Sequence, residues 1–328
     1  MLIHKDQPQD ALLKAKEAET QMKALQDLIT TQSLEDVDFK SVKFTVFQIL
    51  ADAYKANAMW DDALHRYQRI IKDRDFMYPH LIYFEIGSIY LKMGKYSDAV
   101  KNYEMAINHL HANSTRLAGR FYHCCGIAHI KQGDFTKALS NFENAMTKDP
   151  NVKTGFNLVL CHSILSPLEQ LKNAYTRLLA IKPYSTPDAN ESDILGNQQH
   201  VERREEIRLI MLASRLVASK SEKDWQESYE FVLQSLKKSK FPEAAGEFEI
   251  AYSLAYLQHH NAPKAIDMLR QIRKKDPSLM ALAATNLSFL YFIEQQYENA
   301  EKYADIALSH DRFNAQAHVN KGNCLVQA

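Results

Sequence analysis

The sequence predicts an all-α protein in which antiparallel helix pairs stack one after another into a superhelix, an α-solenoid. Small residues recur at intervals of 34 to 39 residues, as at Ala51, Gly87 and Gly126. Around them, apolar side chains follow one another at three- and four-residue steps, the period of one helix face. Glycine and proline separate these stretches, because neither favours a helix interior. One such helix pair buries only one of its faces, so the pairs must stack.

The clearest repeat runs from Tyr122 to Pro150. Gly126 and Ala138 are small enough to let its two helices approach toward the short end of the ~8–10 Å range for packed helices. Gly133 separates the two helices, at a point where a positive φ costs glycine nothing. This spacing resembles the tetratricopeptide repeat, which implies a right-handed solenoid with a period of about 34 residues. The residues that carry the resemblance are Tyr122, Gly126, Gly133, Phe135, Ala138, Phe142, Ala145 and Pro150.

Other repeats can be traced on both sides of this one. An amphipathic helix without a partner is predicted over about Asp10–Thr31, followed by three well-formed repeats and a divergent fourth over about Lys153–Ile181. Two helices without repeat signatures come next, over about 200–220 and from about 222, before the repeats resume. The small residues predicted to pack the helices of the repeats are Ala51, Ala63, Gly87, Ala99, Gly126, Ala138, Ser253, Ala265, Ser288, Ala300 and Gly322.

We therefore expect three parts: an N-terminal array over 1–181, a linker or loop over 182–199, and the spacer helices with a C-terminal array over 200–328. The linker is predicted from Pro183, Pro187 and the polar, turn-forming residues around them. The sequence ends inside the first helix of its last repeat, whereas natural arrays end in a polar capping helix. We expect the chain to be a piece of a longer protein, or to have a partner that covers this end.

Composition disfavours several classes of function. Forty basic residues balance forty acidic ones, so no overall field would hold a nucleic acid or an anionic membrane. The aliphatic run Leu209–Ala213 is far shorter than the ~20 residues that span a bilayer, and no apolar signal core follows Met1. The spacing of Cys124, Cys125, Cys161 and Cys324 suggests no disulfide framework, and we expect reduced, buried thiols.

No catalytic, cofactor or metal site is predicted. His123, Cys124, Cys125 and His129 form the one cluster with metal-like chemistry, but Cys125 stands at a core position and no second ligand pair follows at zinc-site spacing. The pair His259-His260 is expected at the surface. Phosphate-binding glycine loops, HExxH and GxSxG are absent. We expect a protein that is not an enzyme and has no small-molecule substrate.

A concave groove lined by the first helix of each pair is the expected binding surface of a solenoid. The family's best-known site, a clamp for chaperone C-terminal carboxylates, resembles a ring of Lys, Asn and Arg side chains. At those positions this chain has Gln48, Asp52, Glu85, Arg120 and Cys124, and only Arg120 keeps the required character. Two acidic residues would repel a carboxylate. The candidate groove residues are Gln48, Asp52, Glu85, Ser88, Arg120 and His123.

Two segments carry a narrower resemblance. Thr154–His162 reads TGFNLVLCH, and Ala284–Asn323 contains NLSFLY, YAD, DRFN and VNKGN in that order. These two segments, together with the order of the helices and repeats along the chain, resemble a tetratricopeptide-repeat subunit of the intraflagellar transport B complex. The resemblance extends from about Asp10 over essentially the rest of the chain. The family's long N-terminal region and later repeats have no counterpart here.

This resemblance implies a non-catalytic scaffold subunit for building cilia or flagella, located in the cilium, the basal body and the cytoplasm. It implies other core subunits of the complex as partners, notably intraflagellar transport protein 52, and kinesin-2 indirectly, with neither nucleic acid binding nor membrane insertion. Two alternatives stay open: a generic peptide-binding adaptor of co-chaperone type that lacks the carboxylate clamp, and a repeat array that regulates an enzyme or is attached to one.

Overall fold

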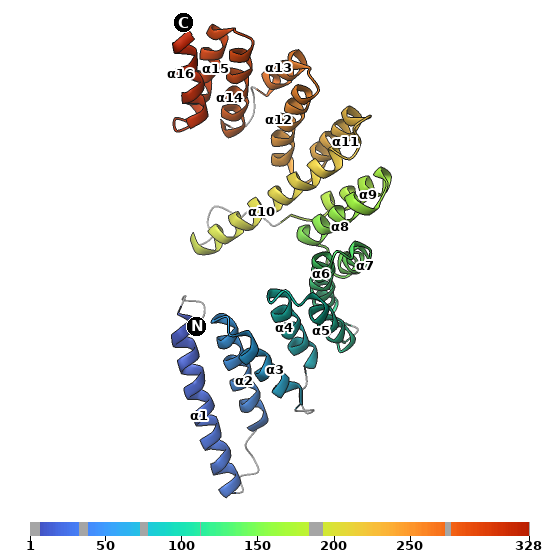
Figure 1. The fold of residues 1–328 in the computed structure, drawn as a ribbon, viewed down its shortest axis with the longest axis vertical. Coiled ribbons are helices and arrows are strands. Elements are labelled where there is room, and N and C mark those ends of the chain that lie inside the picture. The colour runs from blue at the N-terminus through green and yellow to red at the C-terminus, as the bar shows by residue number, and fades with distance from the viewer. Residues whose placement is uncertain are drawn as a thin grey trace. The chain divides into compact units, whose positions relative to one another are not determined.

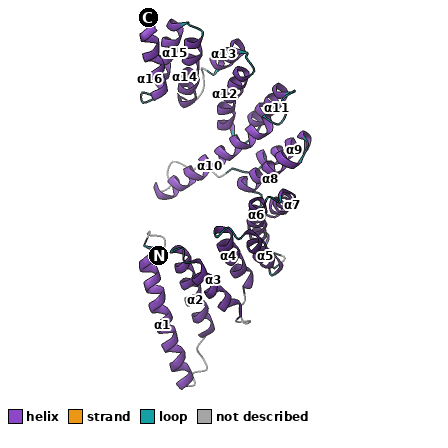
Figure 2. Cartoon of the chain, in the orientation of Figure 1, coloured by secondary structure: helices purple, strands orange, loops and turns teal. Residues whose placement is uncertain are grey.

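The computed structural model describes residues 7–32, 39–72, 78–111, 113–183, 193–272 and 277–327. Over these ranges the chain forms sixteen α-helices and no strand, as Figures 1 and 2 show. The fold is an all-α tetratricopeptide-type solenoid of antiparallel helix pairs, which confirms the predicted fold class. The chain divides into two compact units, Met1–Pro150 and Asn151–Ala328. None of the described helices is both long enough and apolar enough to cross a membrane.

The unit Met1–Pro150 contains one unpaired helix followed by three helix pairs (Figure 1). The unpaired helix, predicted over about Asp10–Thr31, packs along the first helix of the first pair. Each pair then packs against the next through its second helix. The helices are α1 (Pro8–Gln32), α2 (Phe39–Ala56) with α3 (Trp60–Lys72), α4 (Pro79–Lys92) with α5 (Tyr96–Asn108), and α6 (Thr115–Gln132) with α7 (Phe135–Lys148).

The unit Asn151–Ala328 contains four further pairs and a last single helix. Its first helices form an inner layer, since α8, α10, α12 and α14 pack in succession. The two helices without repeat signatures form a pair like the others. The helices are α8 (Val152–Leu165) with α9 (Leu168–Leu179), α10 (Asp193–Ala218) with α11 (Trp225–Lys238), α12 (Pro242–Gln258) with α13 (Ala262–Gln271), α14 (Pro277–Ile293) with α15 (Tyr297–His310), and α16 (Ala315–Gln327).

The structure describes only part of the predicted linker at 182–199. Residues 184–192 of that linker lie outside the described residues, and α10 begins at Asp193 rather than at about His200. The later turns of α10 pack against other helices, and this packing supplies the helix nucleus. The helix can then extend toward its N-terminus, because each added residue gains one hydrogen bond without a new nucleation step. The compact units divide earlier, after Pro150, because α8 and α9 pack against α10. A functional boundary at 182–199 stays a prediction.

The small residues of the predicted repeats lie where helices come closest. Eight of them have no exposed surface: Ala51, Ala63, Ala99, Ala138, Ser253, Ala265, Ser288 and Ala300. A Cβ atom added at Gly87 would lie 2.8 Å from the Tyr103 ring, and one at Gly126 would lie 2.7 Å from the Phe142 ring. Gly322 on α16 differs, because it is exposed and has no atom within 4 Å of an added Cβ.

Five repeats share one backbone feature at the turn between their helices. Gly94 and Gly133 have φ values of 75° and 82° there, as suits glycine. Ala58, His260 and Gln295 occupy the equivalent positions, seven residues after the small packing residue, with φ values of 56°, 56° and 61°. Side chains make this left-handed conformation unfavourable by roughly 1–2 kcal/mol. The closure of the helix pair, rather than the residue type, therefore imposes it.

Replacing Ala58 by glycine is expected to raise the free energy of unfolding by about 0.5–1 kcal/mol. The substitution removes the αL penalty of ~1–2 kcal/mol, and the greater freedom of glycine in the unfolded chain offsets part of the gain. The Ala58 methyl group is exposed, so no packing is lost. Urea unfolding measures the change, and the reverse substitution Gly133→Ala should destabilise by a similar amount. A lower midpoint for Ala58→Gly would contradict this interpretation of the turn.

Candidate functional site

The polar groove residues predicted from the sequence lie on the first helices of unit Met1–Pro150. Gln48 and Asp52 are on α2, Glu85 and Ser88 on α4, and Arg120 and His123 on α6. Gln48 and Arg120 are exposed, whereas the other four side chains are half-buried because each contacts a neighbouring helix or the next turn of its own. Their role in binding a partner stays a prediction.

Lys55 joins two of these residues across neighbouring repeats. Its Nζ lies 2.9 Å from Oδ1 of Asp52 and 2.7 Å from Oε2 of Glu85, and the Tyr67 hydroxyl donates to Asp52 at 2.8 Å. Burial lowers the pKa of the Lys55 ammonium, but the hydrogen bonds and charges of Glu85 and Asp52 outweigh it and raise the pKa overall. Burial is the largest cause that raises the pKa of the Tyr67 hydroxyl, and the negative charges of Asp52 and Glu85 raise it further. Lys55, which is not among the groove residues predicted from the sequence, partly neutralises this acidic pair.

The remaining candidates also take part in packing within the unit. Ser88 donates a hydrogen bond to the Phe84 carbonyl oxygen at 2.9 Å. The Arg120 guanidinium lies 5.0 Å from the centre of the Phe84 ring, and the His123 ring meets the Phe142 ring edge-on at 5.8 Å. These contacts hold the side chains in place, so a partner segment laid over α4 and α6 would meet an ordered polar surface.

The histidine and cysteine cluster of α6 has the chemistry of a protein core. Burial raises the pKa of the Cys124 thiol to about 11 and that of Cys125 to about 12. Such thiols stay protonated at neutral pH and are poor nucleophiles and poor metal ligands. His129 is buried, and no hydrogen-bond partner of its Nδ1 is found. Over the described residues, no group of three or more metal-ligating side chains is found.

An apolar groove of about 840 Å³ opens on the first helices of unit Asn151–Ala328. We call it the first-helix groove. Its walls come mainly from α8, α10, α12 and α14, which follow one another in Figure 1. The side chains that define it are Phe156 and Leu160 of α8, Leu212 of α10, Leu254 of α12 and Leu282 of α14.

The groove exposes aliphatic side chains that no other described helix of the unit Asn151–Ala328 covers. Leu212, Leu254 and Leu282 keep 38%, 37% and 43% of their surface exposed. Arg215 and Glu247 are the two charged residues among those that line the groove. Contiguous exposed apolar surface of this kind marks protein-interaction sites in soluble proteins. The chemistry of the groove suits a largely apolar protein segment and offers no cluster of cations for a carboxylate.

The sequence contains a signal for this groove that the analysis of polar residues missed. The residue after the small packing residue is polar in two N-terminal repeats, Asp52 and Ser88, and apolar in the third, Ile127. In the α12 repeat it is the groove residue Leu254. Phe289 at the same position of α14 is 51% exposed but is not among the residues that line the groove. Both α12 and α14 carry apolar residues on several faces, so one apolar face packs within the unit and part of another is exposed.

Comparison with known proteins agrees with this architecture. A tetratricopeptide repeat model matches residues 81–108, which span most of α4 and all of α5. The human intraflagellar transport protein 88 homolog is 30% identical over 323 residues, covering 93% of this chain. The chain spans 39% of the length of that relative.

Solved structures with similar helices are repeat proteins of low sequence identity. The C-terminal part of a TPR repeat-containing protein from Cytophaga hutchinsonii is 14% identical, with a TM-score of 0.38 over 84% of this chain and 98% of that one. MamA is 15% identical, with a TM-score of 0.41 over 60% of this chain and 93% of that one. Identities this low give no information on function.

The sequence match and the fold point to the same kind of protein. Tetratricopeptide repeats indicate a scaffold that contacts other proteins, and the first-helix groove supplies a surface of that kind. The chain is a tetratricopeptide-repeat solenoid related, over nearly all of its length, to a segment of intraflagellar transport protein 88.

Proposed function

We propose that the chain is a non-catalytic scaffold of the intraflagellar transport B complex, which holds segments of partner subunits for the assembly of cilia or flagella. The observation that carries the proposal is the 30% identity to the human intraflagellar transport protein 88 homolog over 93% of the chain. The proposed partners are other core subunits of that complex, notably intraflagellar transport protein 52, with kinesin-2 contacted indirectly. The proposed location is the cilium, the basal body and the cytoplasm.

The first-helix groove is the proposed contact surface. Its exposed leucines come from three successive first helices, so a partner segment laid across them would bury apolar side chains on each. Burial of apolar surface stabilises association by roughly 25 cal/mol per Å² before the cost of immobilising the partners. A contact of this kind needs no catalytic geometry.

Replacing Leu254 by aspartate is expected to weaken binding to purified intraflagellar transport protein 52 by at least about thirtyfold. A side chain at the centre of an interface commonly contributes about 2 kcal/mol or more, and the new carboxylate would lie against apolar surface. Fluorescence anisotropy or a quantitative pull-down measures the change. Thermal unfolding of the variant checks that it remains folded.

Leu81→Asp is the matched control, because Leu81 is 40% exposed but lies on α4, outside the groove. This variant should bind as the unaltered chain does. Equal affinity of the Leu254 and Leu81 variants would rule out the groove as the contact surface, and failure of the unaltered chain to bind any core subunit would contradict the scaffold assignment. Binding of a chaperone C-terminal peptide would favour the adaptor alternative instead.

A further inference from the structure

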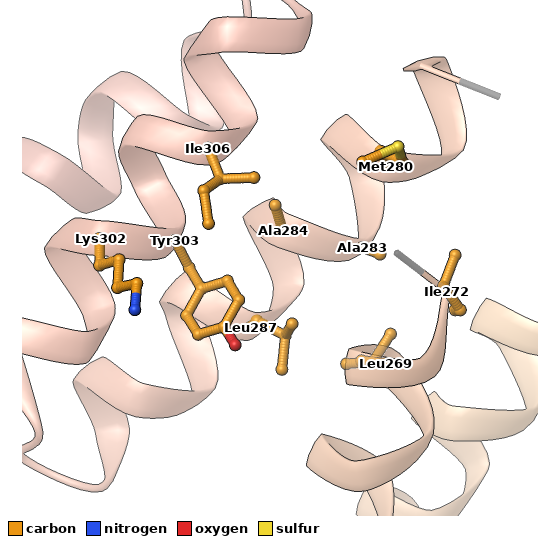
Figure 3. Close-up of a pocket in the computed structure, with 9 residues that line it drawn as sticks. All are labelled: Leu269, Ile272, Met280, Ala283, Ala284, Leu287, Lys302, Tyr303 and Ile306. Carbon is orange, nitrogen blue, oxygen red and sulfur yellow. The ribbon is translucent and has the colours of Figure 1, made fainter. Parts of the chain in front are cut away.

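A second apolar hollow lies on another side of the same unit. A cavity of about 260 Å³ opens between α13, α14 and α15, as Figure 3 shows. Leu269 of α13 and Ile272, just after its end, face Ala283 and Ala284 of α14 across it, and the buried ring of Tyr303 of α15 lies beside Leu287. Because second helices form two of its three walls, this cavity is separate from the first-helix groove.

The cavity exists because α14 has alanine where the N-terminal repeats have a ring. Four residues before the small packing residue, those repeats carry Phe47, Tyr83 and Tyr122, whereas this repeat carries Ala284. The aromatic side chain that the three N-terminal repeats have at this position is therefore missing from the α14 wall. The volume exceeds the ~150 Å³ of an apolar cavity that holds benzene, so it is large enough for one bulky aromatic side chain.

Lys302 is the one charged residue among the described side chains that line the cavity, and three carboxylates lie in a neighbouring surface hollow on α15. Glu298, Glu301 and Asp305 stand on one face of α15, at three- and four-residue steps, and line a surface hollow that shares Lys302 with the cavity. Asp305 pairs with Lys321 at 2.6 Å. Neither Glu298 nor Glu301 has an ion pair within the part of the chain that the structure describes. Among the described residues, Glu298 and Glu301 can thus take a further cation beside the cavity, and the charge of Glu301 already helps to raise the pKa of Lys321.

Lys302 lies between the cavity and these carboxylates. Its ammonium suits the face of an aromatic ring, since a cation within about 6 Å of a ring centre is attracted to it. An aromatic side chain in the cavity would therefore meet apolar walls and one cation, and the residues next to it in sequence would reach the carboxylates of α15. Lysine or arginine at those flanking positions would complement Glu298 and Glu301.

We propose that the cavity and the acidic face of α15 form a second docking site, for a partner segment that presents one tryptophan or phenylalanine next to lysine or arginine residues. The site is independent of the first-helix groove and uses neither Leu254 nor its neighbours. A chain with two such surfaces can hold two partner segments at once.

A fluorescein-labelled pentapeptide with one tryptophan between two pairs of lysines is the probe, and anisotropy with the full chain is the measurement. Peptides with alanine in place of tryptophan, or with glutamates in place of the lysines, should each bind at least about tenfold more weakly. Ala284→Tyr restores the ring found in the other repeats and should reduce binding of the tryptophan peptide by a similar factor. Glu298→Gln combined with Glu301→Gln should reduce binding severalfold and flatten its dependence on salt.

Leu254→Asp should leave binding of the peptide unchanged, so loss of the second site can be distinguished from loss of the groove. Ala284→Leu fills the cavity with a smaller side chain and replaces Ala284→Tyr if the tyrosine variant does not unfold cooperatively. Equal binding of the tryptophan and alanine peptides, stronger binding of the glutamate peptide, or unchanged binding to a folded, filled variant would each overturn the proposal.

Discussion

Replacing Gly126 by leucine is expected to lower the free energy of unfolding of the unit Met1–Pro150 by about 3 kcal/mol. A Cβ atom at this position would lie 2.7 Å from Cε1 and 2.8 Å from Cζ of Phe142. The Phe142 side chain has no exposed surface, so its ring has no open side to move into. Overpacking a well-filled core typically costs ~1–3 kcal/mol, and the rest of the leucine side chain extends beyond the clashing Cβ. Urea unfolding followed by the fluorescence of Trp60, in a Trp225→Phe background, measures the loss.

Gly322→Leu is the matched control. Gly322 is also a helical glycine at the repeat position of Gly126, but an added Cβ there meets no atom within 4 Å. Leucine favours a helix over glycine by up to ~1 kcal/mol, so this variant should be neutral or slightly more stable. Adding Phe142→Leu to Gly126→Leu should recover part of the lost stability, because the smaller side chain makes room. An unchanged unfolding midpoint for Gly126→Leu would contradict the repeat register.

Replacing Glu19 by leucine is expected to detach α1 from the first helix pair and to cost about 2–3 kcal/mol. Glu19 Oε1 lies 2.6 Å from Arg66 Nη1, and this ion pair ties α1 to α3. The two side chains are 10% and 18% exposed. Loss of one partner from a fully buried pair costs ~3–5 kcal/mol, and the partial exposure here reduces that figure. Hydrogen exchange along α1 should accelerate in the variant.

Glu17→Leu provides the control for this prediction. Glu17 forms an ion pair with Lys14 at 2.8 Å on the same helix, but its side chain is 50% exposed and that of Lys14 is 65% exposed. Surface pairs of this kind contribute about 0–1 kcal/mol, so exchange along α1 should hardly change. The double variant Glu19→Leu, Arg66→Met should be more stable than Glu19→Leu alone, because no guanidinium is left unpaired. Equal exchange in the Glu17 and Glu19 variants would show that α1 is held by its apolar contacts alone.

The same ion pair predicts a dependence on pH. Burial raises the pKa of the Glu19 carboxyl, but the hydrogen bond and charge of Arg66 outweigh it, so the pKa lies below its ordinary value of 4.5. A carboxyl whose pKa is lowered by folding stabilises the folded state above its unfolded pKa, and this contribution is lost as the pH falls through the folded pKa. The stability difference between the unaltered chain and Glu19→Leu should be constant near neutral pH and shrink below about pH 4.5.

The helix pairs could be predicted from sequence because their causes are local. Gly126 and Phe142 belong to two helices joined by a short turn, so their spacing along the chain already places them in contact. The positive φ values of Ala58, His260 and Gln295 could not be predicted in this way. Alanine and glutamine do not favour that conformation, and histidine is enriched in it but still adopts it uncommonly, so it arises when the two flanking helices close on each other.

The candidate surfaces depended more strongly on which helices meet. Asp52 and Glu85 were recognised as acidic, but only the packing of α2 against its neighbours places Lys55 between them. Leu254 looks like a core residue in sequence, since α12 carries apolar residues on several faces. It is exposed because the neighbouring helices cover the other faces of α12 and leave this one open.

The sequence by itself determined that the protein is a stack of paired helices, that small residues set the distance between them, and that the chain is related to intraflagellar transport protein 88. Those properties follow from side-chain size and spacing, which act between near neighbours in the chain. Only the tertiary structure decided which apolar side chains stay open to a partner, and that alanine at position 284 leaves a cavity. The exposure of a side chain is a property of the assembled surface, because it depends on which helices pack beside that residue.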